Sequence, residues 1–275
     1  MTVAGLGQQT WQLLGGFRQA AGGVLDPQVA GLTRAAWIGG WTAAARWHRY
    51  ETQGIEHLLT GQPCLIVGYH GRPLAWDMCM LTVEVHRQLG YLPHGVVHSG
   101  LGAGPMATVL RGLGFVTGDG PELEAAVQRG EHILVTPGGT REGCRSQSQR
   151  YKVDWGNRLG YLKLAWRHRL PIVPVAATGV DDVFWGLNDG DRWGRRLGLP
   201  LKLPFWIGLG PAGVWPLSPS FPVQIRQQIG APLVPWEDRS VALGPDALPA
   251  ATVLQQCHLR IQAQVQSMLD TLRKT

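Results

Sequence analysis

One histidine and one aspartate in the segment Gly68–Asp77 could carry out acid–base chemistry. His70 directly follows the apolar run Pro63–Tyr69, which is typical of a buried strand. Catalytic groups of open α/β sheets lie beyond the carboxyl ends of strands, where the loops converge. A histidine there can act as a general base, because its ordinary pKa of about 6.5 lets it accept a proton near neutral pH. A nearby carboxylate would fix its tautomer, and Asp77 is the candidate.

The spacing of His70 and Asp77 sets a condition on this pairing. Six residues separate them. The interval would span about 10 Å as a helix and about 23 Å as a strand, so the two side chains meet only if the chain doubles back. Gly71 and Pro73 favour such a turn. The alternative is that both residues are structural and take no part in catalysis.

A second candidate site is the Gly-rich turn in the segment Ile133–Glu142, which again follows a strand-like run. Gly138 and Gly139 allow backbone N–H groups to approach an anion or a developing oxyanion closely. Arg141 offers a planar fork for phosphate or carboxylate. A solvated basic loop is the alternative interpretation, but the position after a strand favours a site.

Alternating strands and helices are expected to position these residues. The predicted strands are Gly95–His98, Phe115–Thr117, His132–Thr136, Ile172–Ala176 and Pro222–Ile229, in addition to the run before His70. The predicted helices are Trp76–Leu89, Pro105–Leu113, Pro121–Arg129 and Asn157–Arg169. This alternation predicts an α/β fold with a layered, largely parallel or mixed central sheet flanked by helices.

The two ends of the chain are expected to be helical, in a single domain. Residues 1–60 form an N-terminal segment in which Trp37 and Trp41 are framed by arginines, a pattern suited either to a membrane interface or to ordinary packing. The interfacial interpretation is the one favoured by composition. Residues 61–240 are the expected catalytic core. Residues 241–275 carry apolar residues at intervals of three and four, which predicts an amphipathic helix packed on the core.

Composition narrows the classes of function. The net charge is +6, yet only 16% of residues are charged, and 12 Trp outnumber the 10 Phe and Tyr together. This balance suits a surface that meets anionic lipid, whereas nucleic acid is disfavoured because no basic run exists. The four cysteines are scattered, which indicates neither a metal site nor a disulfide framework and predicts a reducing, cytoplasmic location. The longest uncharged stretches, Gln88–Leu110 and Leu203–Ile225, hold too many glycines and prolines for a spanning helix.

Two other enzyme classes are excluded by their motifs. Gly100-Leu-Gly-Ala-Gly104 begins like a dinucleotide fingerprint, but Pro105 stands where the third glycine is required. No G-x-S-x-G segment exists, so the nucleophile elbow of the serine hydrolases is missing.

Four blocks in order along the chain, YHG…D, GFV, TPGGTRE and PIVPV, resemble the lysophospholipid and glycerol acyltransferase superfamily. The resemblance covers roughly residues 60–235. The PGGTRE form and the YKVDWGNRLGYLKLA stretch after it are most similar to the branch that acylates neutral acceptors such as mono- or diacylglycerol. It implies an acyl donor that is a thioester of coenzyme A or acyl carrier protein, with no metal and no bound cofactor.

The resemblance also implies roles for particular residues. His70 would be the general base and Asp77 its partner. The residues that would bind substrate, or shape the strand beside it, are Gly138, Gly139, Thr140, Arg141, Glu142 and Pro174.

Three departures from the family pattern refine this expectation. The family has four residues between the histidine and the aspartate, and it has Glu where this chain has Gly138. After Gly114-Phe-Val116, where many members that use phosphorylated acceptors carry Arg, this chain reads Thr-Gly-Asp-Gly120. The loss of that cation favours a neutral acceptor.

The expected protein is therefore a peripheral membrane O-acyltransferase that transfers a fatty acyl chain to a lipid-like alcohol. One alternative is an acyltransferase of lysophosphatidic acid in phospholipid biosynthesis. A second, of another class, is a non-catalytic lipid-binding protein on the same fold, because a fold alone does not establish activity.

Overall fold

The computed structural model describes residues 27–97, 104–117, 120–199, 203–237, 244 and 248–274. Residues 1–26 of the expected N-terminal segment, most of Gly100–Gly104 and the residues directly after Thr117 lie outside the described residues. Among the described residues, no helix is both long enough and apolar enough to cross a membrane.

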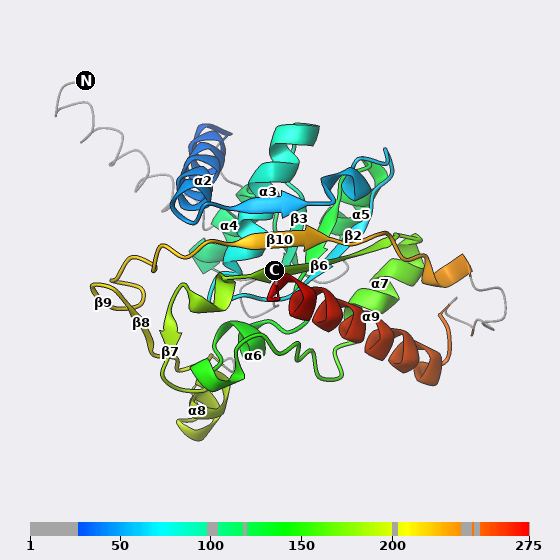
Figure 1. Ribbon diagram of the computed structural model, residues 1–275. Helices are drawn as coiled ribbons and strands as arrows, with labels where there is room; N and C mark the ends of the chain where they lie inside the picture. The colour runs from blue at the N-terminus through cyan, green and yellow to red at the C-terminus, as the bar shows by residue number, and fades with distance from the viewer. Residues whose placement is uncertain are drawn as a thin grey trace.

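A seven-stranded mixed sheet runs through the centre of the protein (Figure 1). Its order is β1 (Glu51–Gln53), β10 (Arg226–Ile229), β6 (Ile172–Thr178), β2 (Leu65–Gly68), β5 (Ile133–Val135), β3 (His94–Val97) and β4 (Val116–Thr117). Every neighbouring pair is parallel except β10 with β6. The predicted α/β class with a largely parallel, mixed sheet is confirmed.

Strand β2 lies at the centre of the sheet because its side chains are apolar on both faces. Leu65 stands in register with Ile133 of β5 and with Ile172 of β6. Leu65 and Val67 enter one hydrophobic cluster, whereas Ile66 enters a second cluster on the opposite face. A parallel strand covered on both faces requires this continuous apolar run, and the run ends where the candidate site begins.

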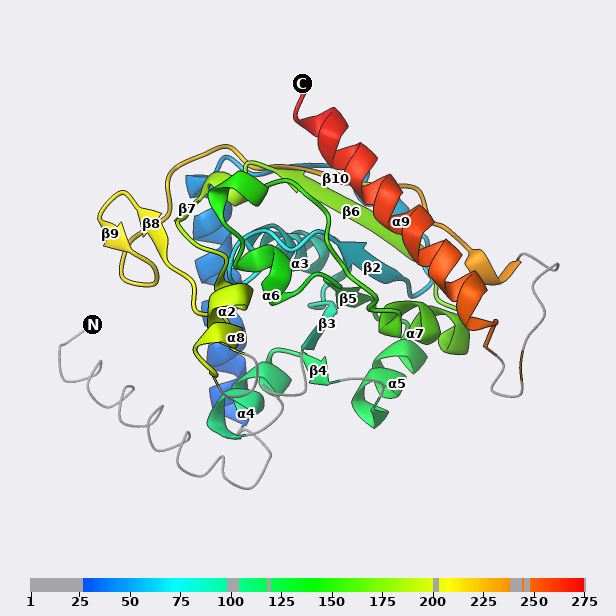
Figure 2. The same ribbon diagram turned by 90° about the horizontal axis from the view of Figure 1, so that it is seen from below.

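Helices cover both faces of this sheet. Helix α3 (Trp76–Leu89) packs on one face with α2 (Pro27–Trp47) against it, and α4 (Gly104–Gly112) contacts α2. Helix α9 (Ala251–Leu272) crosses the other face over β6, beside α7 (Gly160–His168), whereas α5 (Pro121–Gln128) lies at the β4–β5 end of the sheet (Figure 2). The buried stripe of α9 consists of Leu254, His258, Ile261, Val265, Leu269 and Leu272. The predicted C-terminal amphipathic helix is thus observed, packed on the core.

Trp37 and Trp41 of α2 contact the rest of the protein. Trp37 donates a hydrogen bond from Nε1 to the Thr82 hydroxyl at 3.0 Å, and its ring meets Phe115 edge-on. Trp41 packs edge-on against Trp76 at the start of α3. The Trp37–Trp41 spacing, on which the interfacial interpretation depends, therefore marks the side of α2 that contacts the protein, since a helical repeat alone does not say what covers it.

The segment 185–217 leaves the sheet and forms a small separate layer. Strands β7 (Trp185–Gly186), β8 (Gly208–Gly210) and β9 (Gly213–Val214) form a three-stranded antiparallel sheet. Helix α8 (Gly190–Arg196) stands between β7 and β8 in the sequence. This layer lies at one end of the molecule, next to the short helix α6 (Thr140–Gly143).

Candidate active site

The two motifs meet at the carboxyl edge of the sheet. His70 follows β2, and the Gly-rich turn with α6 follows the neighbouring parallel strand β5. A side-chain carbon added to Gly143 would lie 2.7 Å from the Nδ1 and Cε1 atoms of His70. The imidazole therefore rests directly on the backbone of α6, and only glycine leaves room for it there.

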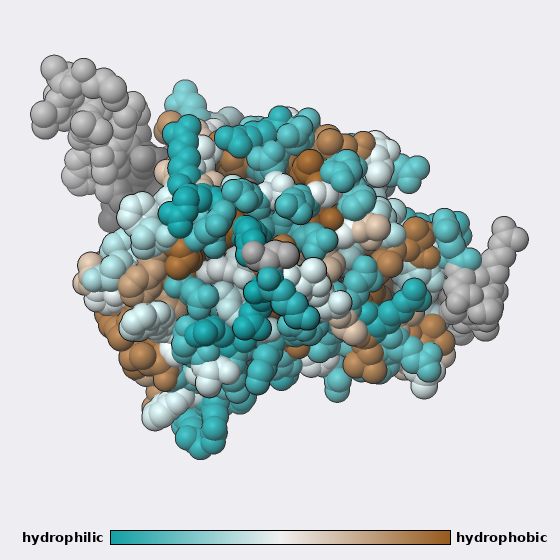
Figure 3. Space-filling model, in the orientation of Figure 1, coloured by the Kyte–Doolittle hydropathy of each residue, from teal (hydrophilic) through white to brown (hydrophobic). Residues whose placement is uncertain are grey.

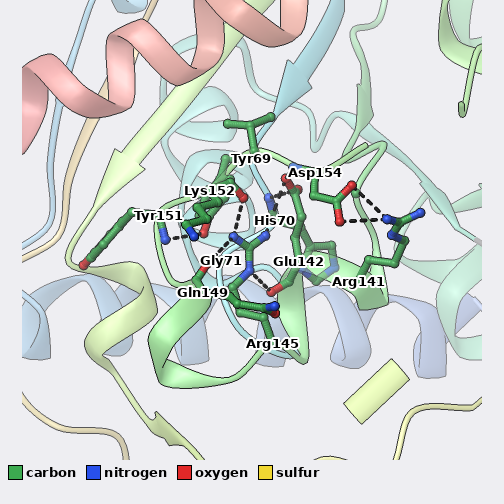
Figure 4. A network of polar contacts seen from close by, with 12 residues as sticks. Tyr69, His70, Gly71, Arg141, Glu142, Arg145, Gln149, Tyr151, Lys152 and Asp154 are labelled. Atoms are coloured by element: carbon green, nitrogen blue, oxygen red, sulfur yellow. Dashed lines mark hydrogen bonds and ion pairs between the residues drawn. The ribbon is translucent and has the colours of Figure 1, made fainter. Parts of the chain in front are cut away.

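The buried Glu142 side chain links the His70 backbone to α6 and to Asp154 (Figure 4). Its carboxylate is wholly buried; Oε2 accepts the His70 backbone N–H at 3.0 Å and Oε1 accepts the Asp154 N–H at 2.8 Å. Arg145 places Nη2 3.6 Å from Oε1. Burial raises the pKa of Glu142 to about 7, against the opposing effect of the Arg145 charge. Glu142 was expected among the substrate-binding residues, and the geometry makes it a positioning residue for His70.

The Glu142 side chain also accounts for one departure from the family pattern. A side-chain carbon on Gly138 would lie 2.0 Å from the Glu142 carboxyl carbon. The Glu142 carboxyl thus fills the space into which a side chain at position 138 would point. A glycine at 138 and a glutamate at 142 are two parts of one arrangement.

The environment of His70 keeps its imidazole neutral. Burial, together with the positive charges of Arg145 and Arg158, lowers the pKa of His70 to about 4. Its Nδ1 is buried and has no hydrogen-bond partner within the described ranges. A neutral ring with an unused nitrogen is the state that a general base requires at neutral pH.

Asp77 returns to the same loop through a sharply bent backbone. Arg72, Leu74 and Ala75 all have positive φ, and the turn carries the chain back so that Asp77 Oδ1 accepts the Gly71 N–H at 3.4 Å. Its Oδ2 is buried, and neither it nor His70 Nδ1 has a partner among the described residues. Burial raises the pKa of the Asp77 carboxyl well above its ordinary value. The structure therefore brings Asp77 to the peptide after His70 without a bond to Nδ1.

Arg72 holds that bent loop in place. Its wholly buried guanidinium donates to the Asp181 carbonyl at 2.7 Å, to the Arg145 carbonyl at 2.8 Å and to Gln147 Oε1 at 2.5 Å. Asp181 in turn accepts hydrogen bonds from the Tyr69 hydroxyl and from the Tyr151 N–H. No local pattern in the sequence indicates this network, because the contacts of Arg72 and Tyr69 join residues more than 70 positions apart.

The other predicted substrate-binding residues lie in the Gly-rich turn, at the start of α6 and in β6. Arg141 is partly exposed and its Nη2 donates to both Asp154 oxygens at 2.9 and 2.8 Å (Figure 4). Gly139 has a positive φ. Arg158 Nη1 donates a hydrogen bond to the Gly138 carbonyl at 2.6 Å, so the arginine stabilises the turn. Thr140 is exposed at the start of α6. Pro174 is buried in β6 in register with Val67, three residues before His70.

No constellation for a metal emerges from the part of the chain that the structure describes. Within it, no three His, Cys, Asp or Glu side chains form a group that could hold a metal ion.

Replacing Gly143 by alanine is expected to lower activity while the protein stays folded. The added methyl would stand 2.7 Å from the His70 ring and 3.0 Å from the Arg72 carbonyl, so the imidazole has to move. A displacement of about 1 Å costs roughly 100-fold in rate. The measurement is kcat beside the thermal unfolding midpoint, with Gly160→Ala as the control because nothing lies within 4 Å of that position. Equal kcat for the two variants would contradict the placement of His70.

Known proteins resemble this chain in sequence and in fold. No family model matches the chain. A protein of Bos taurus called "DGAT1/2-independent enzyme synthesizing storage lipids" is 29% identical over 231 residues, which is 82% of this chain and 65% of the bovine protein. The human protein of the same name is also 29% identical over 231 residues, covering 82% of this chain and 67% of its own length. The chain thus spans about two thirds of the length of these relatives.

A solved structure shares the fold. The crystal structure of the 1-acyl-sn-glycerophosphate (LPA) acyltransferase PlsC from Thermotoga maritima matches with a TM-score of 0.52 at 14% identity, over 95% of this chain and 88% of that one. The chain therefore has the fold of that acyltransferase, with His70 beside the Gly-rich turn at the carboxyl edge of its mixed sheet. In sequence the chain is similar to the two proteins named for storage-lipid synthesis, and in fold it is similar to the Thermotoga acyltransferase.

Proposed function

We propose that the protein is an O-acyltransferase that transfers a fatty acyl chain from a thioester to the hydroxyl of a lipid-like alcohol, with His70 as general base. The single observation that carries the proposal is the His70 imidazole, kept neutral by burial and resting on α6 of the PGGTRE segment. The donor is a thioester of coenzyme A or of acyl carrier protein, and the enzyme works at the cytoplasmic surface of a membrane without a bound cofactor.

The proposed reaction needs one base and one set of hydrogen-bond donors. The His70 imidazole takes the proton of the acceptor hydroxyl while its oxygen attacks the thioester carbonyl. The resulting tetrahedral oxyanion is stabilised by a backbone donor of the Gly-rich turn, and the candidate is the Gly138 N–H, because the Gly139 N–H already donates to the Thr136 carbonyl at 3.1 Å. The C–O bond forms in this attack. Collapse of the oxyanion restores the carbonyl and breaks the C–S bond, and the imidazolium returns its proton to the leaving thiolate. Asp77 supports the loop that carries His70.

The proposed acceptor is a neutral glyceride such as mono- or diacylglycerol. Two observations support it: the relatives are named for synthesis of storage lipids, and the segment after Val116 lacks the arginine expected for a phosphorylated acceptor. The competing acceptor is lysophosphatidic acid, the substrate in the name of the Thermotoga protein.

An acceptor panel tests this proposal. Radiolabelled palmitoyl-CoA is offered with monoacylglycerol, diacylglycerol, a long-chain alcohol, lysophosphatidic acid and lysophosphatidylcholine, and the products are separated. Product from the glycerides is expected. Robust transfer to lysophosphatidic acid, with none to glycerides or alcohols, would contradict the neutral acceptor. Lipid binding without product from either kind of thioester would favour the non-catalytic lipid-binding protein.

The pH dependence follows from the lowered pKa of His70. Because burial lowers the pKa of His70 to about 4, the ring stays deprotonated as the pH falls through 6.5. We expect the acid limb of kcat/KM to lie well below 6.5, with activity kept down to about pH 5 and lost as the pH approaches 4. A smaller change near pH 7 that disappears in Glu142→Gln is assigned to the Glu142 carboxyl. Loss of activity with an inflection at 6.5 would contradict a buried base.

A further inference from the structure

Exposed large hydrophobic side chains are concentrated in the segment 185–217. Nine of the 14 exposed large hydrophobic residues among the described residues fall within it. They are Trp185, Leu187, Trp193, Leu197, Leu203, Phe205, Ile207, Val214 and Leu217, which we call the 185–217 surface. Figure 3 shows hydrophobic side chains gathered where β7, β8 and β9 lie in Figure 1. Clustered exposed apolar residues of this kind mark an interaction site.

The local backbone turns these side chains outward. Residues 203–207 run extended beside 187–194, with hydrogen bonds from the Leu187 N–H to the Ile207 carbonyl and from the Phe205 N–H to the Gly190 carbonyl. In an extended segment alternate side chains share a face. The exposed face carries Leu203, Phe205 and Ile207, and Trp206 points inward. In a solvated strand the exposed side chains are normally polar, whereas here the exposed side chains are apolar.

Helix α8 adds positive charge at the edge of this surface. Arg192, Arg195 and Arg196 are exposed beside Trp193. Arg195 pairs with Asp191, whereas Arg192 and Arg196 make no ion pair with any other described residue. Exposed tryptophan and leucine next to unpaired arginine is the composition of a segment that lies in the interface of an anionic bilayer. Figure 3 shows hydrophilic side chains at the α8 tip, directly below the hydrophobic ones.

The same layer is attached to the candidate active site. Trp206 donates from Nε1 to the Arg145 carbonyl at 3.0 Å, and the Arg72 guanidinium lies over its ring at 5.4 Å from the centroid. The Gly190 N–H donates to the Cys144 carbonyl, directly after α6, at 2.8 Å. A membrane held by this surface would therefore lie next to the loop and helix that carry His70.

We propose that the 185–217 surface is the membrane-docking surface of the protein, which binds anionic bilayers by inserting its apolar side chains and placing Arg192 and Arg196 at the lipid phosphates. This inference rests on the proposed function, since an enzyme of lipid acceptors has to reach them from a bilayer. It assigns docking to this layer, whereas Trp37 and Trp41 of α2 contact α3.

Vesicle co-sedimentation of the full chain without acyl donor tests the assignment. Leu217 has 89% of its side chain exposed, so Leu217→Glu leaves the fold intact. It is expected to weaken binding to phosphatidylcholine–phosphatidylglycerol vesicles about tenfold, from the loss of one buried leucine in the interface. The matched control is Leu259→Glu on α9, where 56% of the side chain is exposed, and it is expected to bind like wild type. Equal binding by the two variants overturns the proposal.

The role of Arg192 and Arg196 is tested by a separate variant with its own control. Arg192→Glu with Arg196→Glu is expected to weaken binding to the anionic vesicles by more than about tenfold, and to leave binding to pure phosphatidylcholine nearly unchanged. Arg260→Glu, an exposed arginine on α9, is the control. Added salt is expected to weaken wild-type binding only to the anionic vesicles. Identical binding to both vesicle types by all of these proteins overturns the role of the arginines.

Two further readouts separate this proposal from its competitors. If wild type is a dimer that Leu217→Glu converts to monomer while vesicle binding is unchanged, the surface belongs to a second copy of the chain and the proposal is overturned. Acyl transfer on detergent-dispersed substrate is expected to be the same in Leu217→Glu and wild type. Binding that depends on the surface, in a protein without any acyl transfer, supports the docking proposal and overturns only the proposed function.

Discussion

Replacing His70 by alanine is expected to lower kcat for acyl transfer about 100- to 10,000-fold, the range that a positioned general base contributes. The imidazole is neutral at pH 7 because burial lowers its pKa to about 4, and its Nδ1 is engaged with no other described group. Removing it takes away the proton acceptor and leaves the backbone hydrogen bond to Glu142 in place. The measurement is the rate of thiol release from palmitoyl-CoA with a glyceride acceptor.

The control for this substitution is His168→Ala at the end of α7, which lies outside the site. The unfolding midpoints of both variants are measured beside the rates, so that a loss of fold is not mistaken for a loss of chemistry. If His70→Ala keeps its fold and its kcat lies within a fewfold of the wild-type value, His70 is not the general base.

Replacing Glu142 by alanine is expected to lower the free energy of unfolding by about 3–5 kcal/mol, the cost of breaking a buried ion pair from one side. The substitution leaves the Arg145 charge without its carboxylate and takes the acceptor from the His70 and Asp154 amides. Activity is expected to fall as well, because the peptide that carries the imidazole loses its anchor. Denaturant unfolding measures the first effect and kcat the second.

Two other variants sharpen this prediction. Glu142→Gln keeps the shape and one acceptor oxygen, and its loss of stability is expected to be smaller than that of Glu142→Ala. Glu124→Ala, on the exposed side of α5, is the control and is expected to change stability by less than about 0.5 kcal/mol. If Glu142→Ala is as stable as Glu124→Ala, the carboxylate does not hold the site together.

The fold was largely predictable from the sequence because its strands are continuous apolar runs. The segments before His70 and before Pro137, and the segment at Ile172–Thr178, read as buried strands, and they form the centre of the sheet. The side chains that cover both faces of β2 explain why the pattern is so clear. The predicted helix bounds differ from those observed by up to a few residues, as with α7, which begins at Gly160 in place of Asn157.

The orientation of the tryptophans was not predictable from their spacing. Trp37 and Trp41 share one side of α2, but a four-residue interval is the same for a helix on lipid and for a helix on protein. What decides the orientation is the Thr82 hydroxyl and the Trp76 ring on α3, which are distant in sequence. The uncharged stretch Leu203–Ile225, in contrast, was visible in the sequence, although the formation of α8 and three short strands in and before it was not.

Within the site, the sequence predicted that each motif follows a strand, but not the contacts that fix them. His70 and the Gly-rich turn were each expected beyond the carboxyl end of a strand, and they meet because β2 and β5 are parallel neighbours. The inward fold of Glu142 and the buried Arg72–Asp181 contact depend on tertiary packing, and neither has a local pattern. The positive φ values of Arg72, Leu74 and Ala75 show how the longer His70–Asp77 interval is accommodated.

The central claim is that this site transfers acyl chains, and one measurement tests it most directly. Purified full-length protein is incubated with monoacylglycerol and radiolabelled palmitoyl-CoA, then with palmitoyl acyl carrier protein, and the labelled glyceride is counted for wild type and His70→Ala. The account predicts labelled diacylglycerol from wild type with at least one donor, and almost none from His70→Ala. Absence of product from folded wild type with both donors, or equal product from the two proteins, would contradict it.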